Sequence, residues 1–85
     1  MRQNNPDTAA LLPTRRSSIA ATVRAEISRA DARQAVVAEH LQISQSALSK
    51  RLKGTVRFTA EELVSIAELL GIPPAVLLGD DRASA

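Results

Sequence analysis

The sequence contains no cysteine and almost no aromatic side chains, and both absences narrow the possible functions. Without thiols the chain forms neither disulfides nor thiolate–metal sites, which is compatible with a reducing compartment. One histidine, His40, cannot hold a zinc ion alone. Phe58 is the only aromatic residue, so the chain lacks the stacking platforms on which single-stranded nucleic acids are bound. We therefore expect no metal, no cofactor and no single-stranded nucleic acid.

The chain also lacks a run of about 18 apolar residues, the length needed to cross a membrane. Pro6, Asp7, Pro13 and Arg15 interrupt the N-terminal segment too often for a signal peptide. Eighty-five residues make at most one small domain. We expect a cytoplasmic protein of a bacterial cell or a phage-infected host, with no membrane partner.

The charge of the chain is divided between its two halves, although the net charge is only +2. Residues 1–57 carry ten basic and four acidic residues, a charge of +6, whereas residues 58–85 carry one arginine and five acids, a charge of −4. Such asymmetry favours one face that meets a polyanion. An unevenly solvated helical protein is the alternative interpretation.

The apolar residues follow a helical period along most of the chain. The helices expected from it cover residues 17–30, 32–40, 45–52 and 60–70, followed by a short helix opened by Pro73 and Pro74 and closed by Gly79. No strand is expected, so the fold class is all-α, a compact domain of five helices. Residues 1–16 have no period and are expected to form a flexible N-terminal arm, residues 17–79 the domain, and residues 80–85 a C-terminal tail.

Polar residues with the properties of N-caps precede three of these helices. Asp31, Ser44 and Thr59 are the predicted caps, and Gln34 and Glu62 stand three residues after the first and the last of them. In a capping box, the N-cap side chain accepts a hydrogen bond from the backbone N–H three residues ahead, and a Glu or Gln at that position accepts one from the N-cap N–H.

Two short helices in the middle of the chain form the most informative feature. Only the residues from Leu41 to Ser44 are available to turn the chain between them, and Ala38 is small enough for the helices to approach closely. This is the packing pattern of a helix-turn-helix.

The second helix of this pair has a polar outer face. With Leu48 pointing inward and 100° per residue, the outward residues are Ser46, Ser49, Lys50 and Lys53, and Gln45 projects from the N-terminal tip. All of them form hydrogen bonds and none is acidic. Such a face suits the major groove of DNA, where Gln pairs with adenine and Lys with guanine or phosphate.

Residues 34–54 resemble the helix-turn-helix of the lambda-repressor-like, Cro/XRE-type regulators, and 58–63 and 66–73 resemble that family's fourth helix and its end. The family pattern has a Gln that opens the first helix, an apolar–Ala pair, a Gly–apolar–Ser turn, an apolar–Ser pair and a closing Gly. Two positions depart from it. Gln42 replaces the turn Gly, which implies a left-handed conformation at Gln42 at some cost in energy. Arg51 stands where an apolar or aromatic residue is common. We expect Arg51 to lie across the edge of the groove rather than to pack.

The resemblance implies a lambda-repressor-like fold and a role for each matching residue. Gln34 would contact a phosphate and brace Gln45, Gln45 and Ser46 would meet base edges, Ser49 and Lys50 would read further bases or the backbone, and Lys53 would contact the backbone. From their positions, Arg57 in the following loop and Arg15 and Arg16 at the end of the arm are further candidates. The expected DNA-binding residues are Gln34, Ser44, Gln45, Ser46, Ser49, Lys50, Lys53, Arg57, Arg15 and Arg16.

Together these features predict a sequence-specific regulator of transcription that binds double-stranded DNA, a repressor of the Cro or phage-immunity type. A homodimer through the apolar residues 76–78 would read a palindromic operator. Ser17, Ser18 and Ser49 have no neighbouring His/Asp pair, so we expect no enzyme, and no small-molecule ligand. Two alternatives stay open: an antitoxin that binds a protein as well as DNA, and an architectural or recombination-directionality factor.

Overall fold

The computed structural model describes residues 15–78, with side chains from residue 18 onward. This part of the chain is built of helices alone: α2 (Arg15–Arg29), α3 (Gln34–Leu41), α4 (Gln45–Leu52), α5 (Ala60–Leu70) and α6 (Pro74–Leu77). The all-α fold of five helices is thereby confirmed. The predicted arm up to residue 14 and the predicted tail lie outside the described residues.

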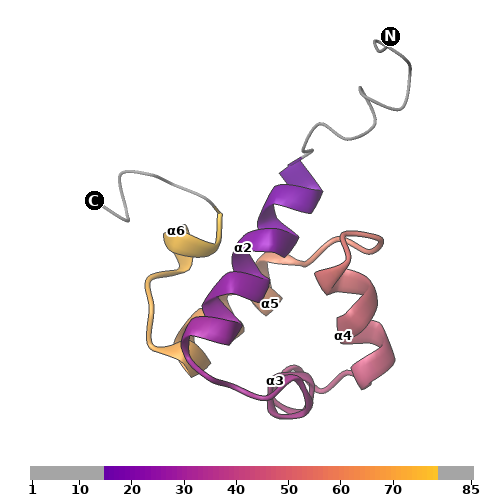
Figure 1. Cartoon of the computed structure of the whole chain (residues 1–85), viewed down its shortest axis with the longest axis horizontal. Helices are drawn as coiled ribbons and strands as arrows, with labels where there is room; N and C mark the ends of the chain where they lie inside the picture. Colours follow the sequence, from indigo (N-terminus) through magenta and orange to yellow (C-terminus); the bar gives the residue numbers. More distant parts are fainter. Residues whose placement is uncertain (1–14, 79–85) are drawn as a thin grey trace, which may run out of the picture.

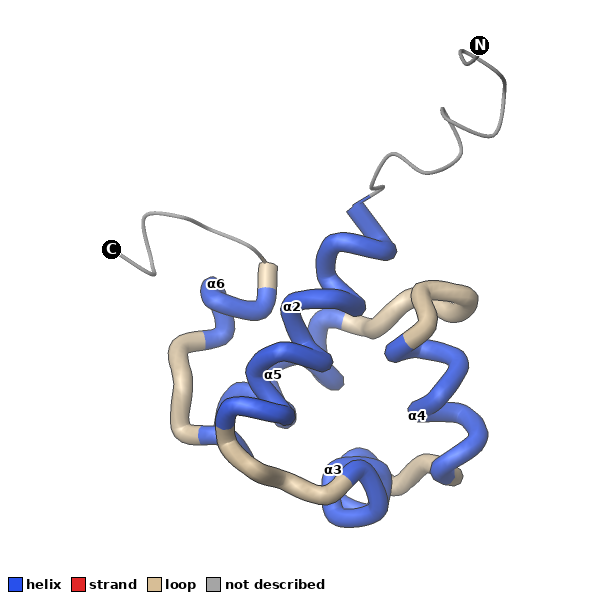
Figure 2. The backbone as a smooth tube through the Cα atoms, viewed as in Figure 1, coloured by secondary structure: helices blue, strands red, loops and turns tan. Residues whose placement is uncertain are grey.

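The helices surround one core, and their contacts close into a ring (Figures 1 and 2). α2 packs against α4 and α6, α4 against α3, α3 against α5, and α5 against α6. α4 and α6 therefore lie on opposite sides of α2, as Figure 1 shows, and α3 closes one end of the molecule. In this arrangement α4 presents one long side to the exterior.

Small and medium aliphatic side chains fill the core, as the scarcity of aromatic residues requires. The buried residues are Ala20, Val23, Ile27, Val37, Ala38, Leu48, Leu52, Phe58, Leu63, Ile66, Ala67 and Leu77. Every helix contributes at least one of them, and no polar or charged residue of the described chain is buried. The core is thus held together by burial of apolar surface.

Four helices end in the same way, with a residue in the left-handed conformation. These residues are Asp31 (φ 56°), Gln42 (φ 61°), Gly54 (φ 82°) and Gly71 (φ 72°). At each end the N–H groups of this residue and of the next donate back to carbonyls of the last helical turn, at 3.0–3.3 Å. This hydrogen-bond pair is the Schellman motif, which satisfies carbonyls that the helix leaves without partners.

The prediction that Asp31 caps the second helix is wrong. Asp31 belongs to the end of α2, because its N–H and that of Ala32 donate to the last turn of that helix at 3.0 and 3.1 Å. Helix α3 begins at Gln34, and its N-cap residue Arg33 makes no side-chain cap hydrogen bond. Aspartate is one of the few residues that tolerates the left-handed conformation as well as the N-cap position, so the same residue type fits either end of a helix.

The two other predicted caps are confirmed. Ser44 Oγ accepts from the backbone N–H of Ala47 at 3.0 Å. Thr59 and Glu62 form a full capping box, with the Glu62 N–H donating to Thr59 Oγ1 and the Thr59 N–H donating to Glu62 Oε1, both at 3.0 Å. Both helices of the C-terminal half of the core, α4 and α5, therefore start where the sequence indicated.

Candidate nucleic-acid interface

The turn between α3 and α4 has the geometry that the sequence predicted. Gln42 adopts φ 61° and ψ 39°, and its N–H donates to the Glu39 carbonyl at 3.0 Å while that of Ile43 donates to the Ala38 carbonyl at the same distance. Ala38 is buried at the place where α3 packs on α4. The short turn and the small side chain hold α4 across α3 as in a helix-turn-helix.

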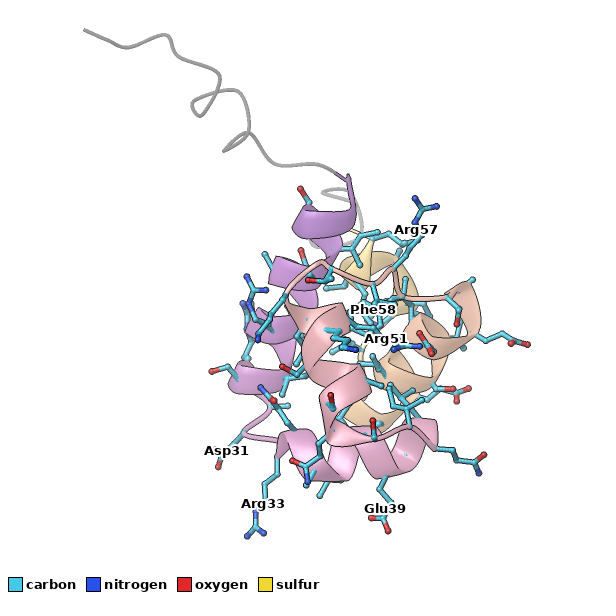
Figure 3. The ribbon with its side chains drawn as sticks, turned by 90° about the vertical axis from the view of Figure 1, so that its right-hand side faces the viewer. Asp31, Arg33, Glu39, Arg51, Arg57 and Phe58 are labelled. Carbon is cyan, nitrogen blue, oxygen red and sulfur yellow. The ribbon has the colours of Figure 1, made fainter. Side chains whose placement is uncertain are left out.

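The inward side of α4 consists of Leu48 and Leu52, which are buried. Its outward residues Gln45, Ser46, Lys50 and Lys53 are exposed, and Ser49 is half-buried. Figure 3 looks onto this side of the molecule, with α4 toward the viewer. The exposed outer face of α4 carries hydrogen-bonding groups and two cations and no acid.

Ser44 and Gln34 stand at the N-terminal ends of α4 and α3. The hydroxyl of Ser44 is exposed and serves as the N-cap acceptor of α4, so its first role is structural. Gln34 is exposed at the first position of α3. N-terminal helix ends direct backbone N–H groups outward, where they favour anions such as phosphate.

The predicted arginines lie at two different places. Arg57 is exposed in the loop between α4 and α5, and Figure 3 shows its side chain pointing away from the body of the domain. Arg15 and Arg16 are helical residues of the first turn of α2 rather than part of the arm, and their side chains lie outside the described residues. The structure therefore places Arg57 on the α4 side of the domain.

The sequence did not single out Arg33. It is exposed, precedes Gln34 as the N-cap residue of α3, and its side chain extends from that end of the helix in Figure 3. It adds a cation beside the predicted phosphate contact at Gln34. Its place directly before Gln34 was the signal that could have found it.

Arg51 does not extend toward the outer face, and the expectation that it would not pack is wrong. Its Nε donates to Glu62 Oε1 at 3.0 Å, and its Nη1 donates to the Ala47 carbonyl at 3.1 Å. The two charged side chains are only 17% and 16% exposed. In Figure 3 the guanidinium of Arg51 turns toward α5. The position that is usually apolar is thus filled by an ion pair that joins α4 to α5.

The environment of Glu62 acts on its acidity in two directions. Burial raises the pKa of the carboxyl, but the hydrogen bond and the charge of Arg51, together with the hydrogen bonds from Thr59, outweigh it, so that the pKa of Glu62 lies below its ordinary value. The carboxylate is therefore ionised at neutral pH and the pair with Arg51 is a true ion pair.

A second arginine bonds to the C-terminal end of α4. Arg24 on α2 donates from Nη1 to the carbonyl of Leu52, the last residue of α4. A cation at the C-terminal end of a helix also interacts favourably with its dipole. The sequence does not reveal this partner, because Leu52 lies 28 positions away.

This arrangement defines a helix-turn-helix DNA-binding domain, in which α4 packs on α2 and α3 and presents one exposed polar face. Over the described residues no group of three or more His, Cys, Asp or Glu side chains could hold a metal ion. Within that same stretch no helix has the length and apolarity to span a membrane.

Comparison with known families agrees with this class. The model of a family described as "Helix-turn-helix domain" matches residues 18–78, most of the chain, and the chain belongs to this family. The family is part of the XRE/Cro lambda-repressor-like clan, whose members bind DNA and are typically not enzymes. Comparison with curated proteins and with solved structures gave no significant match.

Proposed function

We propose that this protein is a sequence-specific regulator of transcription, a non-enzymatic cytoplasmic repressor of the Cro or phage-immunity type that inserts α4 in the major groove of operator DNA. The observation that carries the proposal is the exposed, hydrogen-bonding and acid-free outer face of α4, held rigidly by a helix-turn-helix. Side chains of this kind discriminate base edges in the major groove. A helix that merely faces solvent usually mixes acids among its cations.

In this proposal the residues divide by what they contact. Gln45 and Ser46, at the exposed N-terminal end of α4, meet base edges, because the first residues of a recognition helix lie deepest in the groove. Ser49 and Lys50 reach further bases or the backbone. The phosphate contacts come from exposed groups around α4, namely Gln34, Ser44, Lys53, Arg57 and, beside them, Arg33; Arg15 and Arg16 are further candidates.

The proposal includes a homodimer that reads a palindrome through the C-terminal apolar segment. Of the three apolar residues there, Leu77 is buried, Val76 is half-buried and Leu78 is 50% exposed. One large apolar side chain therefore stays uncovered at the end of α6. A two-fold dimer would place its half-sites about one helical turn apart, ~34–36 Å.

The decisive experiment is selection of bound sequences from a pool of random duplexes. We expect a preferred, inverted-repeat site. Binding without a preferred sequence, combined with bending of the DNA, would contradict the operator proposal and favour an architectural factor. Binding of this chain to the protein product of a neighbouring gene, with the outer face of α4 still exposed, would favour the antitoxin alternative.

The dimer is tested separately by sedimentation of the full chain with and without its selected duplex. Leu78→Ser should shift the protein toward monomer and weaken binding to the full palindrome more than to a half-site. Val64→Ser is the matched control, because Val64 is a similarly exposed apolar residue (43%) on another helix. Equal effects of both changes would contradict a contact through residue 78.

A further inference from the structure

The proposed recognition helix, α4, carries three basic residues in its last turn and C-cap, and their side chains have different surroundings. Lys50 and Lys53 are exposed, whereas the side chain of Arg51 between them is 17% exposed and bonded to α5. An arginine has the reach and the five donors to grip a phosphate. Its guanidinium is instead occupied by a carboxylate from the neighbouring helix.

We propose that Glu62 keeps the guanidinium of Arg51 off the phosphate backbone and so limits the sequence-independent affinity of this protein for DNA. The inference rests on the proposed function, since it concerns the same surface. It assigns to Glu62, a residue that lies outside the expected contact surface, a role in setting how the protein binds DNA.

The carboxylate of Glu62 is held in place by bonds that do not involve Arg51. Its Oε1 accepts from the N–H of Thr59, and its own N–H donates to Thr59 Oγ1. These capping-box bonds hold the side chain in one orientation, so pairing with Arg51 costs Glu62 little conformational entropy. The N-cap of α5 therefore serves a second purpose as the anchor of the ion pair.

Arg51 is held at two points as well. Nε donates to Glu62 at 3.0 Å, and Nη1 donates to the carbonyl of Ala47, one turn earlier in α4, at 3.1 Å. Both acceptors lie on the protein, and the pair is largely withdrawn from solvent, where an ion pair is screened least. Transfer of the guanidinium to a phosphate would leave the Glu62 carboxylate ionised, half-buried and without its cation.

The size of the effect follows from counterion release. Each phosphate neutralised by a basic side chain contributes about 0.9 to the slope of log K against log salt, which is about a five-fold change in affinity at ~0.15 M salt. Because a phosphate contact does not depend on the base sequence, it tightens binding to every stretch of DNA. The pair with Glu62 removes this contribution from a residue that lies on the recognition helix itself.

The test measures the binding of the full chain to a random-sequence duplex over a series of NaCl concentrations. Glu62→Gln retains the capping box, since glutamine also forms it at that position, but it removes the negative charge that pairs with Arg51. We expect its salt slope to be steeper than that of the wild type by about 0.9, with about five-fold tighter binding near 0.15 M salt. Thermal melting shows whether each variant is folded at the temperature of the assay.

Glu61→Gln is the matched control. Glu61 is the exposed neighbour in the same helical turn, and the substitution changes the net charge equally, but the Glu61 carboxylate does not pair with Arg51. We expect little change in slope for Glu61→Gln. In the double variant Glu62→Gln/Arg51→Met the slope should return to the wild-type value, because the additional contact belongs to Arg51.

Three results would overturn the inference while leaving the proposed function intact. They are equal slopes for Glu62→Gln and the wild type, an equal steepening by Glu61→Gln, and a shallower slope for Arg51→Met alone, which would show that Arg51 already contacts DNA. A wild-type protein that binds no duplex even at low salt would instead contradict the proposed function and the inference together. Failure to select a preferred sequence would contradict only the operator proposal.

Discussion

Replacement of Gln42 by glycine should stabilise the protein. Gln42 stands in the turn of the helix-turn-helix with φ 61° and ψ 39°, a conformation that costs an L-residue other than glycine about 1–2 kcal/mol. Its side chain is exposed, and no hydrogen bond of the described structure uses it. The two hydrogen bonds that close the turn are backbone bonds from residues 42 and 43, at 3.0 Å each, and glycine keeps both.

The expected gain is a difference between two opposing contributions. Glycine relieves the left-handed strain, but it raises the conformational entropy of the unfolded chain, which costs about 0.5–1 kcal/mol. The net stabilisation is then about 0.5–1 kcal/mol, and for a domain of this size about 1 kcal/mol corresponds to a rise in Tm of roughly 4–8 °C. Asp31→Gly should gain less, because aspartate tolerates φ 56° better than glutamine tolerates a similar angle.

The measurement is urea and thermal unfolding followed by helical circular dichroism. Gln42→Ala is the control, because alanine removes the same exposed side chain but keeps the Cβ that causes the strain. We expect the free energy of unfolding of Gln42→Ala to stay within about 0.5 kcal/mol of the wild type. If Gln42→Gly were less stable than the wild type, or no more stable than Gln42→Ala, the strain argument would be refuted.

Three further changes test other features of the domain. Ser44→Ala should lower the free energy of unfolding by about 1 kcal/mol, measured by urea denaturation, because it removes the acceptor of the 3.0 Å cap bond; an unchanged midpoint would contradict the cap. Lys53→Ala should weaken binding to all duplexes alike and lower the salt slope by about 0.9. Gln45→Ala should instead cost about 1–3 kcal/mol of preference for the selected site at an unchanged slope. Identical effects of the two variants in competition assays would contradict the division into phosphate-contacting and base-contacting residues. The folded-state pKa of Glu62 is lowered. Its contribution to stability is therefore present above the unfolded pKa, about 4.3, and is lost as the pH falls through the folded pKa. Glu62→Gln should accordingly flatten the acid limb of a curve of unfolding free energy against pH.

Much of the fold could be predicted because its signals are local. The capping box at Thr59 joins residues three apart in the sequence, and the cap at Ser44 spans the same distance. Helical periodicity is also a property of near neighbours. Asp31 shows the limit of such signals. The local sequence allows it to start a helix or to end one, and the backbone bonds of Asp31 and Ala32 to the last turn of α2 decide in favour of the end.

The partners of Arg24 and Arg51 could not be predicted, because they depend on tertiary packing. Arg51 meets Glu62 eleven positions away across a loop, and Arg24 meets the Leu52 carbonyl 28 positions away. Family likeness even pointed in the wrong direction at Arg51, since a basic residue at a usually apolar position was expected to face the DNA. The position of Glu62 in space, which the sequence does not reveal, determines where the Arg51 side chain lies.

These contacts change the meaning of the charge asymmetry between the two halves of the chain. A total of +6 over residues 1–57 treats every cation as available to DNA, but the guanidinium groups of Arg24 and Arg51 bond to the protein itself. One acid of the negative half, Glu62, neutralises one cation of the positive half. In the proposed complex, fewer phosphate contacts are therefore expected than the sequence charge suggests, and a larger share of the binding energy would come from base contacts at the tip of α4. Such a division of contacts would favour selectivity, because base contacts discriminate between sequences and phosphate contacts do not.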